Sequence, residues 1–465
     1  MRSNQLNVFM LLGTVFLFQS ASHAAPLDNT KVEGYKGIWF SLGQHSEYGD
    51  KYSGGLGTYT AKHVPIACYS EEAQKTFFVY GGARDALDTH LLIMASYYDH
   101  KKGTVPKPTV VCDKEVVSDP HDNGSILLDG SGHLWVFVSG RGRNRPGYTY
   151  RSLSPFSIDR FERIREKELT YPQPWYIPDK GFFHCFTKYT KGRELYWETS
   201  ADGYEWTEDK KLAGFGGHYQ ISCLHEERLA TAFNYHPHAS VDKRTNLYYV
   251  ESTDFGMSWH NISGQSLEAP LDDKHNAALI HDFESEGRLV YLKDMAFDSQ
   301  GYPVILVVTS ADYQPGPSGD PRLWTLIRWN GTKWQLTEVT VSDHNYDMGS
   351  LYISSGKEWR IIAPTAPGPQ PWGTGGEMVL WKSEDNGNSW NKVSDITRNS
   401  VRNHAYARRP VNAHPDFFAF WADGNPETLS ESHLYFTDSK GSQVWELPYT
   451  MDKDFATPKT LYSEK

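Results

Sequence analysis

The sequence has few cysteines, and none of them is paired in a short motif. Four cysteines occur among 465 residues, and no two have the C-x-x-C spacing of paired-cysteine metal or redox sites. We expect Cys68, Cys112, Cys185 and Cys223 to be buried thiols, or two of them to form one disulfide, without a catalytic role. Cys185 and Cys223 are candidate neighbours because they occupy similar places in successive repeats.

Long apolar segments are absent beyond the first residues. One basic residue, Arg2, precedes an apolar stretch at 7–18, and small residues follow up to Pro26. This order is typical of a secretory signal peptide, and the apolar stretch is too short for a permanent membrane span. We interpret residues 1–24 as a cleaved signal peptide and 25–465 as one domain of a secreted or periplasmic protein, expected to be a monomer with no membrane span.

Positive charge is in deficit, which bears on the class of partner. The formal net charge is −11, so a nucleic-acid partner is not expected. The sequence also contains no glycine-rich phosphate loop and no nucleophile elbow. No cofactor is required by any motif, although a structural metal ion stays open.

Helical periodicity is nearly absent, and short β-type runs separated by turn residues take its place. Runs such as 75–80, 133–138 and 302–308 are rich in β-branched and aromatic residues and end at Gly, Asn, Asp or Pro. The fold class predicted is therefore all-β.

A short motif, Ser-x-Asp-x-Gly-x-x-Trp, recurs along the chain. It occurs at 252–259 and 383–390, and a version one residue shorter occurs at 200–206. The Asp is expected to accept local backbone N–H bonds, the Gly to adopt a positive φ, and the Trp to pack under the hairpin. We interpret the motif as structural.

A longer unit of about 50–60 residues surrounds this motif and predicts a seven-bladed β-propeller. The segment at 34–40 is expected to supply a strand of the last blade and so close the ring, which removes exposed sheet edges. The seven units are predicted to begin near Thr58, His121, Phe182, His218, Lys293, Asp347 and Ala407.

Titratable side chains gather at the predicted strand starts, where a propeller brings them to one mouth. Together they suit β-elimination on a uronic-acid polymer, which needs a cation for the carboxylate, a base and an acid. The predicted catalytic residues are His121 as base or acid, Tyr219 as its partner, Arg244 as a neutralising cation and His218 in reserve. The predicted substrate-binding residues are Arg141, Arg143, His236, Asp294, Tyr346, Arg408 and Arg409, with Arg141 and Arg143 as further neutralising cations and His236 as a further reserve.

Metal-ligand spacing is weak throughout. His236 and His238 are close in sequence, and a group of His184, Cys185, Cys223 and His225 could converge, but neither set has a standard spacing.

Several segments, together with the Ser-x-Asp motifs, give the chain a family resemblance. The segments 35–40, 52–59, 121–125 and 406–412 make it resemble the BNR repeat-containing seven-bladed propeller family over essentially the whole mature chain. The resemblance implies action on a polymer of rhamnose and uronic acid such as ulvan, since the family includes ulvan lyases and enzymes acting on the rhamnose–glucuronate bond.

The resemblance also implies two His, a Tyr and an Arg at the centre of one face. His121 matches one His, whereas Arg141 replaces the second, 182–184 lack a clear Tyr, and Asp202 replaces the Arg. Tyr219 and Arg244 would then take over those roles. For related rhamnosidases, the resemblance places Gln44 or His45 at the position of a His on the opposite face.

Two alternatives to a lyase stay open. A glycoside hydrolase, an α-L-rhamnosidase, would need paired carboxyl groups, for which Asp122, Asp294 and Asp347 are available. A non-catalytic sugar-binding propeller would use the aromatic residues, which make up 14% of the chain.

Overall fold

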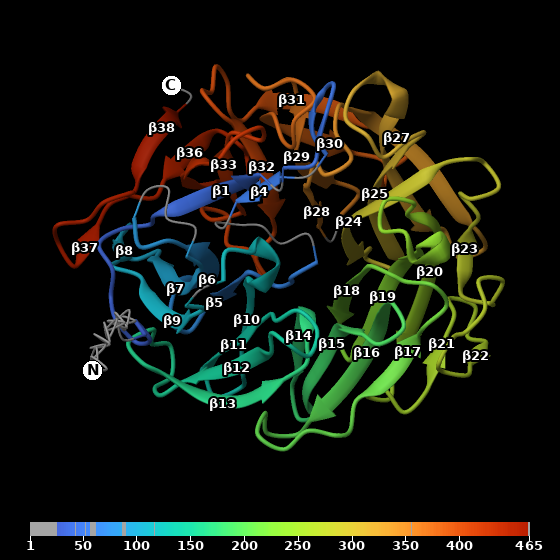
Figure 1. Ribbon diagram of the computed structural model, residues 1–465, viewed down its shortest axis with the longest axis horizontal. Helices are drawn as coiled ribbons and strands as arrows, with labels where there is room; N and C mark the ends of the chain where they lie inside the picture. The colour runs from blue at the N-terminus through green and yellow to red at the C-terminus, as the bar shows by residue number, and fades with distance from the viewer. Residues whose placement is uncertain are drawn as a thin grey trace, which may run out of the picture.

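The computed structural model describes residues 26–41, 43–51, 53–55, 62–85, 90–115, 117–354 and 356–463, and these fold almost entirely as β-strands around a ring (Figure 1). Helical structure in this part of the chain is limited to three short 3-10 turns, at Pro120–Asp122, Pro237–Ala239 and Pro317–Gly319. No helix of the described residues is long and apolar enough to cross a bilayer. The expected signal peptide lies outside the described residues.

Seven antiparallel sheets form the blades of the ring, each built from strands that lie close together in the sequence. The first three blades contain β5 (Ala67–Ser70), β6 (Lys75–Gly82), β7 (Leu92–Asp99) and β9 (Thr109–Asp113); then β10 (Gly124–Leu128), β11 (Leu134–Val138), β12 (Gly147–Ser152) and β13 (Phe161–Lys167); then β14 (Thr170–Ile177), β15 (Gly181–Tyr189), β16 (Arg193–Ser200) and β17 (Lys210–Ala213).

The fourth blade is extended at its outer edge. It contains β18 (Gln220–His225), β19 (Arg228–Tyr235), β20 (Thr245–Ser252), β21 (Trp259–His260) and β22 (Ser266–Leu267), and β23 (Leu279–His281) also pairs with β20. The last three blades contain β24 (Leu289–Phe297), β25 (Pro303–Ser310), β26 (Arg322–Trp329) and β27 (Trp334–Ser342); then β28 (Ser350–Ile353), β29 (Trp359–Ala366), β30 (Glu377–Ser383) and β31 (Asn391–Asp395); then β32 (Asn403–Arg408), β33 (Ala419–Gly424), β35 (Leu434–Thr437), β36 (Gln443–Glu446) and β38 (Lys459–Ser463).

The seven blades confirm the predicted fold class, and most predicted units begin within a few residues of the first strand of a blade. The exception is Phe182, which lies in β15, the second strand of the third blade. The true first strand, β14, contains Pro172 and Pro174 and has a register shift between Thr170 and Gln173. Because proline is rare inside strands, this segment does not read as a strand in the sequence. The unit predicted near Thr58 lies outside the described residues.

The N-terminal strand joins the last blade differently from the expectation. All five strands of the last blade come from residues 403–463, so β1 (Gly37–Ser41) fills no gap in it. Instead β1 pairs with β34 (Ser430–Ser432), in the connection between β33 and β35, and with β4 (Ser53–Gly55). A second link joins the C-terminal part of the chain to the first blade. In it, β37 (Phe455–Ala456) pairs with β8 (Val105–Pro106) beside the first blade. A small hairpin of β2 (His45–Ser46) and β3 (Gly49–Asp50) lies between β1 and β4 in the sequence.

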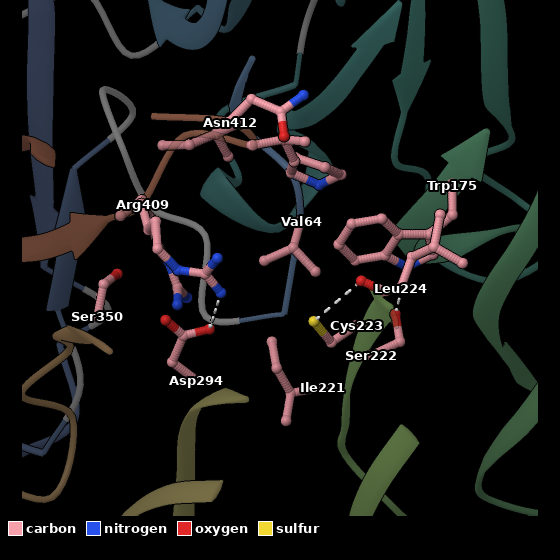
Figure 2. A pocket seen from close by; sticks show the side chains of 14 residues that line it. Val64, Trp175, Ile221, Ser222, Cys223, Leu224, Asp294, Ser350, Arg409 and Asn412 are labelled. Atoms are coloured by element: carbon pink, nitrogen blue, oxygen red, sulfur yellow. Dashed lines mark hydrogen bonds and ion pairs between the residues drawn. The ribbon is translucent and has the colours of Figure 1, made fainter. Parts of the chain in front are cut away.

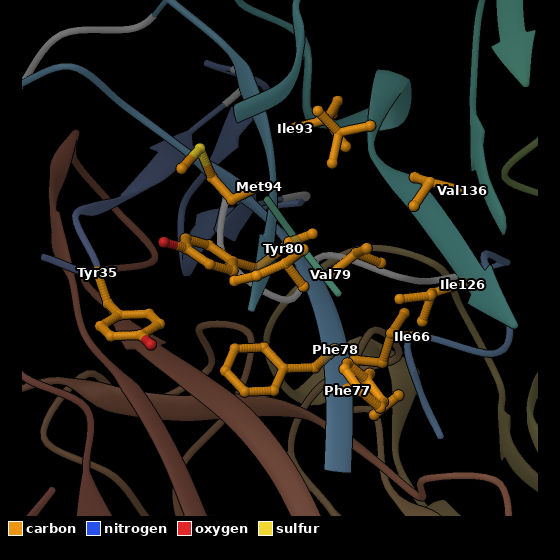
Figure 3. Packing of buried hydrophobic residues seen from close by; sticks show 14 of the residues in the cluster. Tyr35, Ile66, Phe77, Phe78, Val79, Tyr80, Ile93, Met94, Ile126 and Val136 are labelled. Carbon is orange, nitrogen blue, oxygen red and sulfur yellow. The ribbon is translucent and has the colours of Figure 1, made fainter. Parts of the chain in front are cut away.

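Apolar packing joins the first, second and last blades into one continuous core, part of which Figure 3 shows. The fully buried Phe78 ring lies 4.9 Å from the Phe420 ring and 5.8 Å from the Phe417 ring, centroid to centroid. Tyr35 is also fully buried, and its hydroxyl donates to the Pro106 carbonyl at 2.7 Å. The seam where the ring closes is therefore held mainly by burial of aromatic surface.

The three Ser-x-Asp motifs form the expected turns. Gly256 and Gly387 have φ values of 83° and 78°, and Asp254 accepts a hydrogen bond from the Ser258 N–H at 2.9 Å. An added Cβ at Gly256 would lie 2.7 Å from Trp197 Nε1, so the turn also needs the missing side chain.

Candidate functional site

The start of the first strand and the end of the second strand lie at the same edge of each blade. In the second blade Gly124 pairs with Val138, and in the fourth Gln220 pairs with Phe233. Side chains just outside these positions therefore share one face of the ring, which we call the strand-start face. His121, Arg141, Tyr171, Tyr219, His236, Arg244 and Tyr346 all lie there, next to strand starts or second-strand ends.

His121 is held by a carboxylate on the 3-10 turn before β10. Its Nδ1 lies 2.5 Å from Asp119 Oδ1, and Arg145 binds the other Asp119 oxygen at 2.6 Å. Burial lowers the pKa of His121 more than Asp119 raises it, so the imidazole is neutral at neutral pH. With its Nδ1 proton donated to Asp119, the neutral ring carries its basic lone pair on Nε2.

Tyr219 lies among positive charges. Burial raises the pKa of its phenol, but the charges of Arg193, Arg244 and Arg141 outweigh burial. The resulting pKa of Tyr219 is below the ordinary value of tyrosine. The Arg244 guanidinium carbon lies 4.5 Å from the Tyr219 ring centroid, and that of Arg193 lies 5.9 Å away. These cations favour the phenolate, which makes Tyr219 a stronger acid than an isolated tyrosine.

Tyr171 lies between His121 and Tyr219. Its ring centroid is 6.0 Å from the His121 ring and 5.5 Å from the Tyr219 ring. The Tyr171 backbone has a φ of 56°, a conformation that is strained for a bulky side chain. The surrounding structure thus keeps this ring in place between the two groups at a cost in backbone energy.

Arg244 is held by aromatic rings. Its guanidinium lies 4.5 Å from the Tyr291 centroid and 4.9 Å from the Tyr346 centroid, and it donates to the Tyr346 hydroxyl at 2.7 Å. Tyr346 therefore positions Arg244, and the two predicted residues act as one unit.

Arg193 and Tyr189 belong to this group and were not found from the sequence. The Arg193 and Arg141 guanidinium carbons lie 5.3 Å and 5.8 Å from the Tyr189 ring centroid. Among the described residues, the buried Tyr189 hydroxyl and Arg193 Nε have no hydrogen-bond partner. The two residues flank the turn between β15 and β16, so Tyr189 lies at a second-strand end. This position was missed because a first strand was predicted to begin at Phe182.

The two reserve histidines differ in their surroundings. Both His218 nitrogens are used, because Nδ1 bonds the Asn234 carbonyl at 2.9 Å and Nε2 accepts from the Phe215 N–H at 3.3 Å. Burial lowers the pKa of His218 to about 4, which fits a neutral structural ring. His236 is fully buried 4.9 Å from the Tyr219 ring, and neither of its nitrogens has a hydrogen-bond partner among the described residues.

Four predicted residues lie away from this group. The Arg143 side chain is 83% exposed and faces Glu168. Arg408 ends β32 instead of starting it, and its Nη1 donates to the Lys293 carbonyl at 3.0 Å. Asp294 lies in the middle of β24, where it pairs with Arg409 at 3.5 Å.

Asp294 and Arg409 line a cavity of about 150 Å³ together with Trp175 and Cys223. Figure 2 shows these side chains. These residues lie along or beyond the first strands, away from their starts. Gln44 and His45 are exposed on and beside the small β2–β3 hairpin.

Of the two states expected for the cysteines, the structure has the buried thiols, and the predicted metal groupings do not form among the described residues. All four cysteines are buried free thiols, and burial raises the pKa of Cys223 to about 11. His184 bonds Glu198 Oε1 at 3.0 Å and joins no metal-ligand group with Cys185, Cys223 or His225 among the described residues. In the part of the chain that the structure describes, His236 and His238 do not converge with a third ligand either.

The fold and site together define a seven-bladed propeller with a cationic, tyrosine-rich centre on one face. The model of the BNR repeat-containing family matches residues 74–342, more than half of the chain. The chain belongs to this family.

Curated relatives share about a fifth of their residues with this chain. An ulvan lyase of Nonlabens ulvanivorans is 22% identical over 337 residues, which cover 64% of this chain and 69% of the relative. An ulvan lyase of an Alteromonas species is 21% identical over 343 residues, covering 64% and 68%.

Solved structures support the fold. A polysaccharide lyase of family PL25, an ulvan lyase, superposes with a TM-score of 0.68 at 16% identity, covering 83% of this chain and 94% of that chain. The polysaccharide lyase Uly1 gives a TM-score of 0.59 at 11% identity, covering 89% and 98%.

Proposed function

We propose that this protein is a secreted or periplasmic polysaccharide lyase that cleaves an ulvan-type polymer of rhamnose and uronic acid by β-elimination. One observation carries the proposal: three arginines, a tyrosine of lowered pKa and a carboxylate-bound histidine meet on one face of the ring. Relatives named as ulvan lyases support the substrate class.

Arginine is suited to the first requirement of the reaction. Arg141 and Arg193 are only partly buried and flank Tyr189, so they can contact the uronate carboxylate. Bidentate hydrogen bonds from guanidinium neutralise the carboxylate and acidify the C5 proton of the sugar.

Proton transfer falls to His121 and Tyr219. Neutral His121 takes the C5 proton on Nε2, and Asp119 stabilises the imidazolium formed. The electron pair of the C5–H bond forms the C4–C5 double bond as the C4–O4 bond breaks. Tyr219 gives its phenolic proton to O4, and Arg193 and Arg244 stabilise the resulting phenolate.

Hydrolysis by paired carboxyl groups fits the carboxyl groups of the site less well. Asp122 is neutralised by Lys114 at 3.0 Å and by Arg145 at 2.7 Å, and Asp294 is paired with Arg409. Neither is left as a free acid or base. The third candidate, Asp347, is fully buried and accepts hydrogen bonds from the Ser342 hydroxyl at 2.6 Å and from the Gly375 N–H at 2.7 Å.

The test is incubation of the purified protein with ulvan while ultraviolet absorbance and reducing ends are measured together. The proposal predicts that both rise in step, because elimination creates an unsaturated uronate at each cut. Tyr219→Phe should lower kcat by about 100-fold or more, because the acid is lost. Tyr204→Phe, an exposed tyrosine away from the site, is the control. Reducing ends without absorbance would indicate a hydrolase, and binding without either would indicate a sugar-binding propeller.

A further inference from the structure

A group of metal-ligand side chains lies at the seam between the first and last blades, away from the strand-start face. His100 follows β7 of the first blade, and His414 and Asp416 lie in the β32–β33 connection of the last blade. One nitrogen or oxygen of each residue lies within 4.8 Å of the others. This is the sole grouping of that kind in the part of the chain that the structure describes.

We propose that His100, His414 and Asp416 bind a divalent transition-metal ion that links the first blade to the last. Two imidazoles and one carboxylate suit Zn²⁺, and a water can complete a tetrahedral site. Ca²⁺ is not expected to bind, because it requires six or more oxygen ligands.

His100 is oriented as a metal ligand requires. Its Nε2 lies 2.8 Å from Thr76 Oγ1, and its buried Nδ1 has no hydrogen-bond partner among the described residues. When Nε2 donates its proton to Thr76, Nδ1 presents a lone pair. A hydrogen bond from the second ring nitrogen is the usual support of a metal-bound histidine.

The other two proposed ligands lie beside His100. The His414 ring lies 3.9 Å from the His100 ring, centroid to centroid, and its Nδ1 is 3.8 Å from Asp416 Oδ2. Tyr69 packs against both imidazoles, at 5.3 Å and 4.9 Å. The Asp416 side chain is 65% exposed, which leaves an entry path for the ion.

The affinity should be moderate. The Asp416 N–H donates to His414 Nδ1 at 3.1 Å, so an ion at that nitrogen would replace an existing hydrogen bond. We therefore expect binding of Zn²⁺ in the micromolar range, with stabilisation of the folded chain by mass action.

The test uses the full-length protein, stripped with chelator and free of any histidine tag, titrated with Zn²⁺ alone by calorimetry. The expected result is one ion bound per chain and a higher Tm with Zn²⁺ but not with Ca²⁺. His414→Asn and Asp416→Asn should each weaken Zn²⁺ binding by more than about 10-fold and remove the Tm increase. These two residues are partly or largely exposed, so the variants should fold.

The exposed His275→Asn is the matched control and should behave as the unaltered protein. Equal Zn²⁺ binding by the unaltered protein and both site variants, or no binding at all, would overturn the proposal. The outcome is independent of any activity on polysaccharide.

Discussion

At the scale of single residues, Arg193 connects the electrostatics of the site to its chemistry. Among the groups that lower the pKa of Tyr219, Arg193 has the largest effect. Because the acid must be protonated to react, activity should fall as pH rises through this pKa.

Arg193→Met should therefore move the basic limb of the kcat/KM profile to higher pH, because loss of the cation raises the pKa of Tyr219. The same variant should lose about 100-fold or more in rate, since one carboxylate-neutralising group is gone. Steady-state rates on ulvan across pH measure both effects. A lower rate with an unchanged basic limb would contradict the predicted effect of Arg193 on the pKa of Tyr219.

Asp343 provides a residue-scale prediction about stability. Burial raises its pKa from 3.8 to about 6, and Asp347 lies beside it in the same buried group. A carboxyl whose pKa is raised on folding contributes stability below its unfolded pKa, and this contribution is lost as pH rises through the folded value. Asp343→Asn should thus gain stability relative to the unaltered protein between about pH 4 and about pH 7.

Urea unfolding at several pH values measures this difference, with the exposed Asp272→Asn as control. A difference that does not change with pH would contradict the expected protonation of Asp343.

At the scale of elements, the Ser-x-Asp turns hold the outer strands of the blades. Asp254 accepts from the Ser258 N–H at 2.9 Å and the Ser258 hydroxyl at 2.5 Å. Asp254→Ala should lower the free energy of unfolding by about 1–3 kcal/mol, because these donors lose their partner. Activity per folded molecule should stay unchanged, and the exposed Asp272→Ala should have little effect. A loss of kcat in folded Asp254→Ala would give the turn a role beyond structure.

The strand pattern and turn chemistry made the fold and part of the site predictable from the sequence. His121, Arg141, Tyr219 and Arg244 follow from the rule that strand starts and second-strand ends share an edge. Tyr189 and Arg193 were missed because the prolines of β14 conceal a strand and shift the count by one.

Arg408 was wrongly predicted to lie at a strand start. The first strand of the last blade begins at Asn403, so Arg408 pairs with Phe420 at the far end of β32. The spacing of repeated units in the sequence predicts the number of blades. It does not predict the register of each strand, which depends on partner strands that are distant in the sequence. Arg143 illustrates the same limit, because a loop arginine two residues from Arg141 faces solvent.

At the scale of the whole molecule, closure of the ring depends on the seam between the first and last blades. Phe78 is fully buried there against two phenylalanines of the last blade. Phe78→Ala should lower the free energy of unfolding by about 3–5 kcal/mol, through lost burial and the cavity left behind. Leu336→Ala, at a side chain that is 42% exposed, should change it by less than about 1 kcal/mol. Equal effects of the two changes would contradict a seam held by apolar packing.

Closure of the ring also brings residues of three blades together on one face. His121, Tyr219 and Arg193 come from the second, fourth and third blades and meet only because the sheets close around one axis.

Mass spectrometry of the products formed from ulvan in water labelled with heavy oxygen distinguishes elimination from hydrolysis at the site. Elimination takes no oxygen from water, so we expect unlabelled products with one unsaturated uronate at each new non-reducing end. These products should be lost with Tyr219→Phe. Saturated products that carry the heavy oxygen would show hydrolysis and contradict elimination.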